Sequence, residues 1–211
     1  MGGCLGPSKP YRASSQILAD LEKQYPGTSI EGPEERAGLG VTKKTFGKPL
    51  KNLMWTLGGT GEISAGTVQD ASMTKTAQAN LSIDRLTGVF RASTIAKGTI
   101  KIKDANIVHL YHLNGTTVDI DSCNVCLISE NNQDTTITVR RGRIIAVDNG
   151  DIVVKKGPGV VFQHCDTSTP DFQLVKGDAA MELFYKVRNN KPAKMEGLDG
   201  LSSMPSFFCF C

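Results

Sequence analysis

One spacing constrains the fold of this 211-residue chain more than any other feature. After residue 59, pairs of apolar residues separated by a single residue recur at nearly constant intervals. The pairs are Leu81-x-Ile83, Ile100-x-Ile102, Val118-x-Ile120, Ile137-x-Val139 and Ile152-x-Val154, in steps of 19, 18, 19 and 15 residues. Alternation of this kind predicts half-buried strands, and a unit of about 15 to 20 residues corresponds to one coil of a β-helix.

The residues between these pairs support the same interpretation. Ala105-Asn106 precedes an apolar run at 107–113, Cys123-Asn124 precedes 125–128, and Gly142-Arg143 precedes 144–147. We therefore predict a mainly β protein, a right-handed parallel β-helix of about 5 to 7 coils with a short N-terminal helix. The alternatives are a meandering antiparallel barrel and a pleckstrin-homology-like sandwich, because their strands also recur at short, regular intervals.

Stacked coils also make a prediction about charge. Aligning the repeats places Lys103, Asp121 and Arg140 at equivalent positions on an outward face. Each opposite-charge pair in such a ladder contributes about 0.2 to 1 kcal/mol. A shift of one residue would turn the apolar pairs out to solvent, so the pattern specifies the register.

The chain divides into four parts. A helix beginning at Ser14 or Ser15 would place Ile17, Leu18 and Leu21 on one face. Residues 26–41 hold Pro and Gly without periodicity and indicate a loop or linker. We expect a membrane anchor at 1–13, helix and linker at 14–57, the β-helix at 58–190, and a flexible apolar tail at 191–211.

The N-terminus, Met1-Gly2-Gly3-Cys4, suggests lipid attachment. Removal of Met1 would expose Gly2 for myristoylation, and Cys4 is placed for palmitoylation. Gly6 stands where a hydroxyl residue is usual. One myristoyl chain binds a membrane only marginally, so the second acyl chain is what makes the attachment stable.

Further residues could assist the anchor. The apolar C-terminus carries Cys209 and Cys211, which could be palmitoylated, or its phenylalanines could dock on the core. Lysines and arginines near the anchor could contact anionic lipid. These membrane-surface candidates are Lys9, Arg12, Lys43, Lys44, Lys48 and Lys51.

Composition excludes several classes of function. Lys and Arg number 24 against 21 Asp and Glu, a net charge of +3 that does not favour nucleic acid. No apolar run reaches the ~18 residues of a membrane span. We expect a protein on the cytoplasmic face of a membrane, with the plasma, ciliary and cortical membranes as candidates. Six cysteines are too few to indicate a secreted disulfide framework.

A zinc site is an alternative interpretation of the cysteines. Cys123 and Cys126 of Cys123-Asn-Val-Cys126 could supply two zinc ligands, and a second group of residues could supply two more. That group comprises His109, His112, His164 and Cys165. Reduced cysteines can instead be small buried hydrophobes, and we expect neither a metal nor a cofactor.

Two segments carry a resemblance to a known family. Ile102-Lys-Asp-Ala-Asn-Ile-Val-His-Leu-Tyr111 and Thr116-Thr-Val-Asp-Ile-Asp-Ser-Cys-Asn-Val-Cys126 resemble the β-helical domain of tubulin-binding cofactor C and cyclase-associated proteins. The nearest likeness is to the branch that contains the retinitis pigmentosa 2 protein. The likeness is carried by residues 98–130, and it implies that Cys123 and Cys126 lie in the stacked interior of the β-helix. That branch also includes acylated members.

The resemblance implies a role with GTPases or the cytoskeleton. The cofactor C branch accelerates GTP hydrolysis with an arginine that neutralises charge in the transition state. In this chain Val153 stands where that arginine would be, which favours a non-enzymatic protein. Cationic residues nearby are candidates for partner binding. They are Arg140, Arg141, Arg143, Lys155 and Lys156.

Three functions follow as hypotheses. The first is a lipid-anchored, non-catalytic β-helical module that recruits a small GTPase, actin or tubulin to a membrane. The second is a GTPase-activating protein for an Arf-like GTPase that uses a shifted arginine, Arg140, Arg141 or Arg143. The third is a pleckstrin-homology-like scaffold of a membrane compartment.

Overall fold

The computed structural model describes residues 14–40, 43–56, 58, 60–129, 132–147, 150–156, 161–164, 171–177 and 180–186. Side chains are described at 18–40, 43–56, 58, 60–128 and 134–141. In chain order the elements are α1 (Ser14–Gln24), β1 (Glu34–Ala37), β2 (Lys43–Phe46), β3 (Leu50–Thr56), β4 (Gly61–Ala77), β5 (Ala79–Ala96), β6 (Thr99–Asn114), β7 (Thr117–Ser129), β8 (Asn132–Val147), β9 (Gly150–Lys156), β10 (Val161–His164), β11 (Asp171–Gly177) and β12 (Ala180–Lys186).

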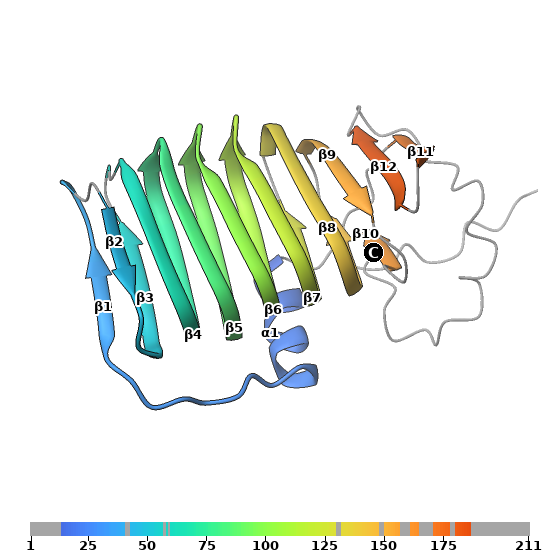
Figure 1. Ribbon diagram of the computed structural model, residues 1–211. Helices are drawn as coiled ribbons and strands as arrows, with labels where there is room; N and C mark the ends of the chain where they lie inside the picture. The colour runs from blue at the N-terminus through green and yellow to red at the C-terminus, as the bar shows by residue number, and fades with distance from the viewer. Residues whose placement is uncertain are drawn as a thin grey trace, which may run out of the picture.

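Strands β3 to β9 stack side by side in chain order, each parallel to the next (Figure 1). Strands hold most of the described residues, in a β-solenoid of about 6 turns. Leu81 pairs with Ile100, Ile100 with Val118, and Val118 with Ile137, as the repeat predicts. The parallel β-helix is confirmed. Parallel pairing throughout this stack contradicts both the antiparallel barrel and the pleckstrin-homology-like sandwich.

The core lies inside the coils, where equivalent residues of successive turns stack. On the first leg of each coil the inward column is at most 3% exposed. It consists of Ile63, Leu81, Ile100, Val118 and Ile137. A second column, from the other leg, brings the fully buried Phe90, Val108 and Cys126 against it. Burying each large apolar side chain stabilises the fold by about 1.5 to 3 kcal/mol.

The solenoid begins earlier than the sequence suggested. Residues 26–41 were expected to be a loop or linker, yet β1 lies within them and pairs in parallel with β3. Strand β2 pairs with β4. The sequence of β1, Glu-Glu-Arg-Ala, has no alternation of apolar and polar residues from which a strand could be inferred. Pairing with β3 supplies the backbone hydrogen bonds that hold β1 extended, although the sequence of β1 does not itself favour a strand.

The last predicted step of the repeat is wrong. The sequence aligned Ile137 with Ile152, whereas the structure pairs Ile137 with Val154 and places Ile152 opposite Thr135. The step from β8 to β9 is therefore 17 residues at Ile137, because the register shifts by one residue between Asn132 and Thr135 on β8. After β9, β10 still pairs in parallel with β8, whereas β12 pairs with β9 and with β11 in antiparallel register.

Helix α1 covers the outside of the second leg, as Figure 1 shows behind β6 and β7. The predicted apolar face is confirmed at Leu18 and Leu21, which are 6% and 1% exposed. These leucines pack on outward apolar residues of β5 to β7. The residues beneath them are Val89, Ile107, Val125 and Leu127. The side chain of Ile17 lies outside those described.

Polar contacts fix the helix and the segment that follows it. Glu22 forms an ion pair with Arg91, and Asn106 Nδ2 donates to the carbonyl oxygen of Tyr25 at 2.9 Å. Asn124 Nδ2 donates to Asn106 Oδ1 at 3.0 Å, so the predicted asparagine corners stack. The chain after α1 then runs along one edge of the coils to β1 (Figure 1).

Candidate functional site

The outward residues of the first leg of β4 to β8 form one exposed face, which we call the ladder face. It consists of Glu62, Ser64, Asn80, Ser82, Asp84, Thr99, Lys101, Lys103, Thr117, Asp119, Asp121, Thr136, Thr138 and Arg140. These residues alternate with the buried core column, so strand periodicity places their side chains on the solvent side. Helix α1 covers the other leg and leaves this face open.

The predicted charge ladder is confirmed and is longer than expected. Arg140 Nη1 lies 2.6 Å from Asp121 Oδ1, and Lys103 Nζ lies 2.6 Å from Asp84 Oδ1. The hydrogen bond to Asp84 raises the pKa of Lys103, and the charge of Asp121 adds to this effect. Opposite charges thus alternate over four successive coils.

Arg140 is held by a second carboxylate that the sequence did not indicate. Its Nη2 donates to Asp119 Oδ2 at 3.0 Å, and its Nη1 also contacts Asp119. The hydrogen bond to Asp119 is the main cause that raises the pKa of Arg140, with Asp121 contributing. The guanidinium therefore bridges two aspartates two positions apart on β7, a geometry that fixes it on the sheet surface.

Replacing Arg140 with Ala is expected to lower the free energy of unfolding by about 1 kcal/mol, because two adjacent carboxylates then repel each other unscreened. The loss should shrink in about 1 M salt, where the Debye length falls to about 3 Å. Urea unfolding at low and high salt measures both values. Arg141→Ala is the control, since Arg141 is exposed and no ion pair of its guanidinium is recorded among the described residues. An equal loss in both variants would contradict the ladder.

The two cysteines of Cys123-Asn-Val-Cys126 lie in the core, 4% and 0% exposed. Burial raises the pKa of Cys123 to about 12, with the charge of Asp104 adding to it, and burial also raises the pKa of Cys126. The interior placement expected from the resemblance is confirmed. Because zinc binds the thiolate, such thiols are poor ligands at neutral pH.

The histidines of the proposed zinc set lie elsewhere. His109 pairs in register with Leu127 rather than Cys126, so its side chain points to the outside of the coil while Cys126 points inward. His112 is exposed. Within the described side chains no group of three or more His, Cys, Asp or Glu could hold a metal ion. The side chains of His164 and Cys165 lie outside the description.

The lysines assigned to the membrane surface face carboxylates in two cases. Lys43 Nζ lies 3.6 Å from Glu62, and Lys44 Nζ lies 3.2 Å from Glu35 and 4.6 Å from the ring centre of Phe46. Lys48 and Lys51 are exposed. In the described part of the chain, no helix has the length and apolarity needed to cross a membrane.

Several predicted site residues lie outside the described residues or side chains. They are Gly2, Cys4, Lys9, Arg12, Arg143, Lys155, Lys156, Cys209 and Cys211. The backbone of Val153, the residue aligned with the family arginine, pairs with Thr136 on β8.

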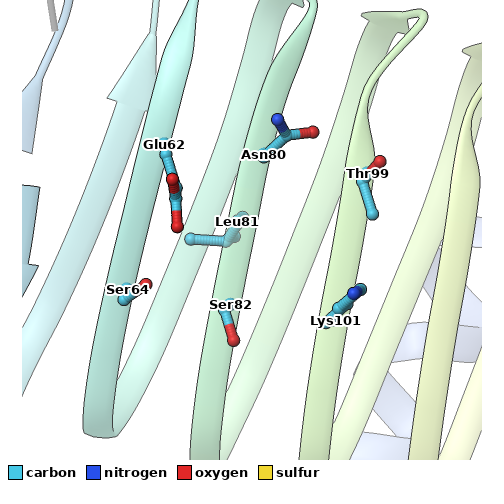
Figure 2. Close-up of a pocket in the computed structure, with 7 residues that line it drawn as sticks. All are labelled: Glu62, Ser64, Asn80, Leu81, Ser82, Thr99 and Lys101. Carbon is cyan, nitrogen blue, oxygen red and sulfur yellow. The ribbon is translucent and has the colours of Figure 1, made fainter. Parts of the chain in front are cut away.

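Sequence reasoning missed a hollow on the ladder face. It has a volume of about 460 Å³ and lies over β4, β5 and β6 (Figure 2). Its floor is shallow because Ser64 and Ser82 are short, and the longer Glu62 and Lys101 stand at its sides. A column of small polar residues in the repeat alignment is the only signal that could have indicated it.

Comparison of the chain with protein-family models, with curated proteins and with solved structures found no match. Membership in the cofactor C family therefore stays a prediction.

Proposed function

We propose that this chain is a lipid-anchored, non-catalytic β-helical module that recruits a protein partner to the cytoplasmic face of a membrane. The partner is a small GTPase or a cytoskeletal subunit, actin or tubulin, as the resemblance at residues 98–130 suggests. The acyl chains on Gly2 and Cys4 supply the membrane attachment, and the solenoid supplies the binding surface.

The observation that carries this proposal is the mixed charge of the ladder face. Four carboxylates and three cations share it: Glu62, Asp84, Asp119 and Asp121 with Lys101, Lys103 and Arg140. Such a face lacks the excess of basic residues that anionic lipid attracts. Its ordered charges on a rigid sheet suit a protein surface of complementary pattern, where they contribute specificity and orientation.

The position of α1 supports the same arrangement. Ser14 begins a helix that is pinned to the second leg, away from the ladder face. The ten peptide steps from Cys4 to Ser14 span at most about 35 Å. Anchoring at Cys4 would hold the solenoid close to the bilayer by its helix-covered side and leave the ladder face accessible to a partner.

The GTPase-activating alternative is disfavoured for Arg140. An arginine finger delivers positive charge to the transition state, and here Asp119 and Asp121 already neutralise that guanidinium. Single-turnover GTP hydrolysis with Arf-like GTPases decides this alternative. Acceleration that is lost in Arg140→Ala, Arg141→Ala or Arg143→Ala would establish an enzyme instead of a recruiter.

Proximity labelling in cells tests the proposal directly. Gly2→Ala is expected to move most of the chain from the membrane to the soluble fraction, because it removes the myristoylation site and a single remaining acyl chain binds only marginally. Gly3→Ala is the matched control, since it keeps both Gly2 and Cys4. The wild type should label a small GTPase, actin or tubulin at the membrane, and Gly2→Ala should lose that membrane labelling.

Two results would contradict the proposal. The first is equal recovery of Gly2→Ala and Gly3→Ala in the membrane fraction, which would show that acylation of Gly2 does not anchor the chain. The second is that the membrane-bound wild type labels none of the three partner classes, which would show that it does not recruit them.

A further inference from the structure

The hollow over β4 to β6 has an ordered arrangement of polar groups. Glu62, Asn80 and Thr99 form one row across the three strands, and Ser64, Ser82 and Lys101 form the row beside it. Figure 2 shows these side chains standing on adjacent strands around the hollow. Ser64 and Ser82 contribute hydroxyl groups to the floor, Leu81 also lines the hollow, and the two charged groups lie at opposite corners.

Lys101 carries a positive charge that its own sheet does not neutralise. Its register partner on β7 is Asp119, but that carboxylate is already bound by Arg140. Among the described residues, no carboxylate oxygen is recorded within ion-pair distance of Lys101 Nζ. The hydroxyl groups of Ser82 and Thr99 and the amide of Asn80 add neutral donors near it. One ammonium with several neutral donors is suited to a carboxylate.

Glu62 has only a weak partner of its own. Its distance to Lys43 is 3.6 Å, and the two side chains are 49% and 71% exposed. An exposed pair of this kind contributes little and exchanges readily with other cations. The opposite corner of the hollow is therefore open to a basic group.

We propose that this hollow binds an extended segment of the protein partner, with an acidic side chain on Lys101 and a basic side chain on Glu62. This inference rests on the proposed recruiting function and adds the chemistry of the segment. Two strand spacings across the sheet and one two-residue step along it separate the corners, about 12 Å on the diagonal. Side chains at positions i and i+2 of an extended segment project from the same face about 7 Å apart. The length of an arginine side chain covers the rest of the distance between Lys101 and Glu62.

Other ligands fit the hollow less well. Anionic lipid headgroups would meet Glu62 at the hollow and Asp84 beside it. Sugars commonly stack on aromatic rings, and none of the seven lining residues is aromatic. A dipolar peptide is the ligand whose charges match both corners.

A peptide titration of the ¹⁵N-labelled full chain tests the site. The probe is acetyl-Ser-Glu-Ser-Arg-Ser-amide, and the matched probe replaces its Glu with Gln. The Glu peptide is expected to shift the amide signals of Ser82, Thr99 and Lys101. Lys101→Gln should weaken its binding about tenfold, the effect of losing one charge-assisted hydrogen bond. Lys23→Gln is the control variant, because Lys23 is exposed on α1 and far from the ladder face.

The outcomes separate this inference from the proposed function. Equal binding of the Glu and Gln peptides, or equal binding to wild type and Lys101→Gln, overturns the site. So do equal shifts from inorganic phosphate at the same concentration, which would mean an unspecific anion site, or shifts caused by phosphatidylserine vesicles alone. If the peptide result holds while labelling in cells finds no partner, the recruiting function fails and the site stands. If a partner is found that Lys101→Gln binds as well as wild type, the site fails and the function stands.

Discussion

Replacing Trp55 with Ala is expected to lower the free energy of unfolding by about 3 to 5 kcal/mol, the largest loss for any single change described here. Trp55 is the only tryptophan of the chain and is 0% exposed on β3. Its backbone pairs with Ala37 on β1 and with Met73 on β4, so the ring packs where the first strands join the solenoid. Urea unfolding followed by far-ultraviolet circular dichroism measures the loss.

Trp55→Phe is the matched control. It keeps an aromatic ring in the same place and removes an indole Nε1 that has no hydrogen-bond partner among the described residues. Relief of that buried polar group offsets part of the lost volume, so the cost should stay below about 1.5 kcal/mol. If Trp55→Ala left the unfolding midpoint unchanged, β1 to β3 would be separate from the cooperative core of β4 to β8.

Trp55 lies at the boundary between the strands that the sequence predicts and those that it does not. The coils from β4 to β8 could be predicted because strands have a period of two and each coil repeats the same apolar pair. Strands β1 and β2 have four residues each and patterns dominated by exposed positions. Their extended form comes from pairing with β3 and β4, which a local pattern does not contain.

Equivalent positions of successive coils share an unusual backbone conformation. Gln78, Lys97, Gly115 and Asp134 all have positive φ, of 54°, 53°, 58° and 47°, the first three between strands and Asp134 within β8. Only Gly115 is a residue type that strongly favours this conformation. The stacked strands on either side impose this conformation, so the sequence could not place these positions. The last step of 17 residues follows from the register shift between Asn132 and Thr135, which the sequence pattern does not show either.

The candidate site was predictable only in part. The column of Lys103, Asp121 and Arg140 followed from the repeat alone. The contact from Arg140 to Asp119 is diagonal to that column and depends on how the long side chain lies. The hollow needs three strands in register and short residues on two of them, so it becomes visible only when neighbouring coils are placed side by side.

Acidification is expected to destabilise the fold through His109 by about 3 kcal/mol between pH 6.5 and pH 4. His109 is 7% exposed, and its ring stacks on Tyr111 at 4.8 Å. Burial is the main cause that lowers the pKa of His109 from 6.5 to about 4, and the nearby charge of Arg91 contributes to this shift. His109 therefore binds a proton near pH 6.5 in the unfolded chain but only near pH 4 in the folded chain. The free energy of unfolding falls as the pH falls through this window.

The difference between two variants isolates this effect from the titration of carboxylates. His109→Leu, which copies the Leu127 that follows it in register, should remove about 3 kcal/mol of the acid-induced loss in urea unfolding. His112→Asn removes an exposed imidazole three residues further along β6, at a position of positive φ that Asn tolerates. This variant should keep the acid-induced loss of stability of the wild type. An acid-induced loss of the same size in His109→Leu and wild type would show that the imidazole is hydrated in solution, and that α1 does not seal the second leg as the packing of Leu18 and Leu21 requires.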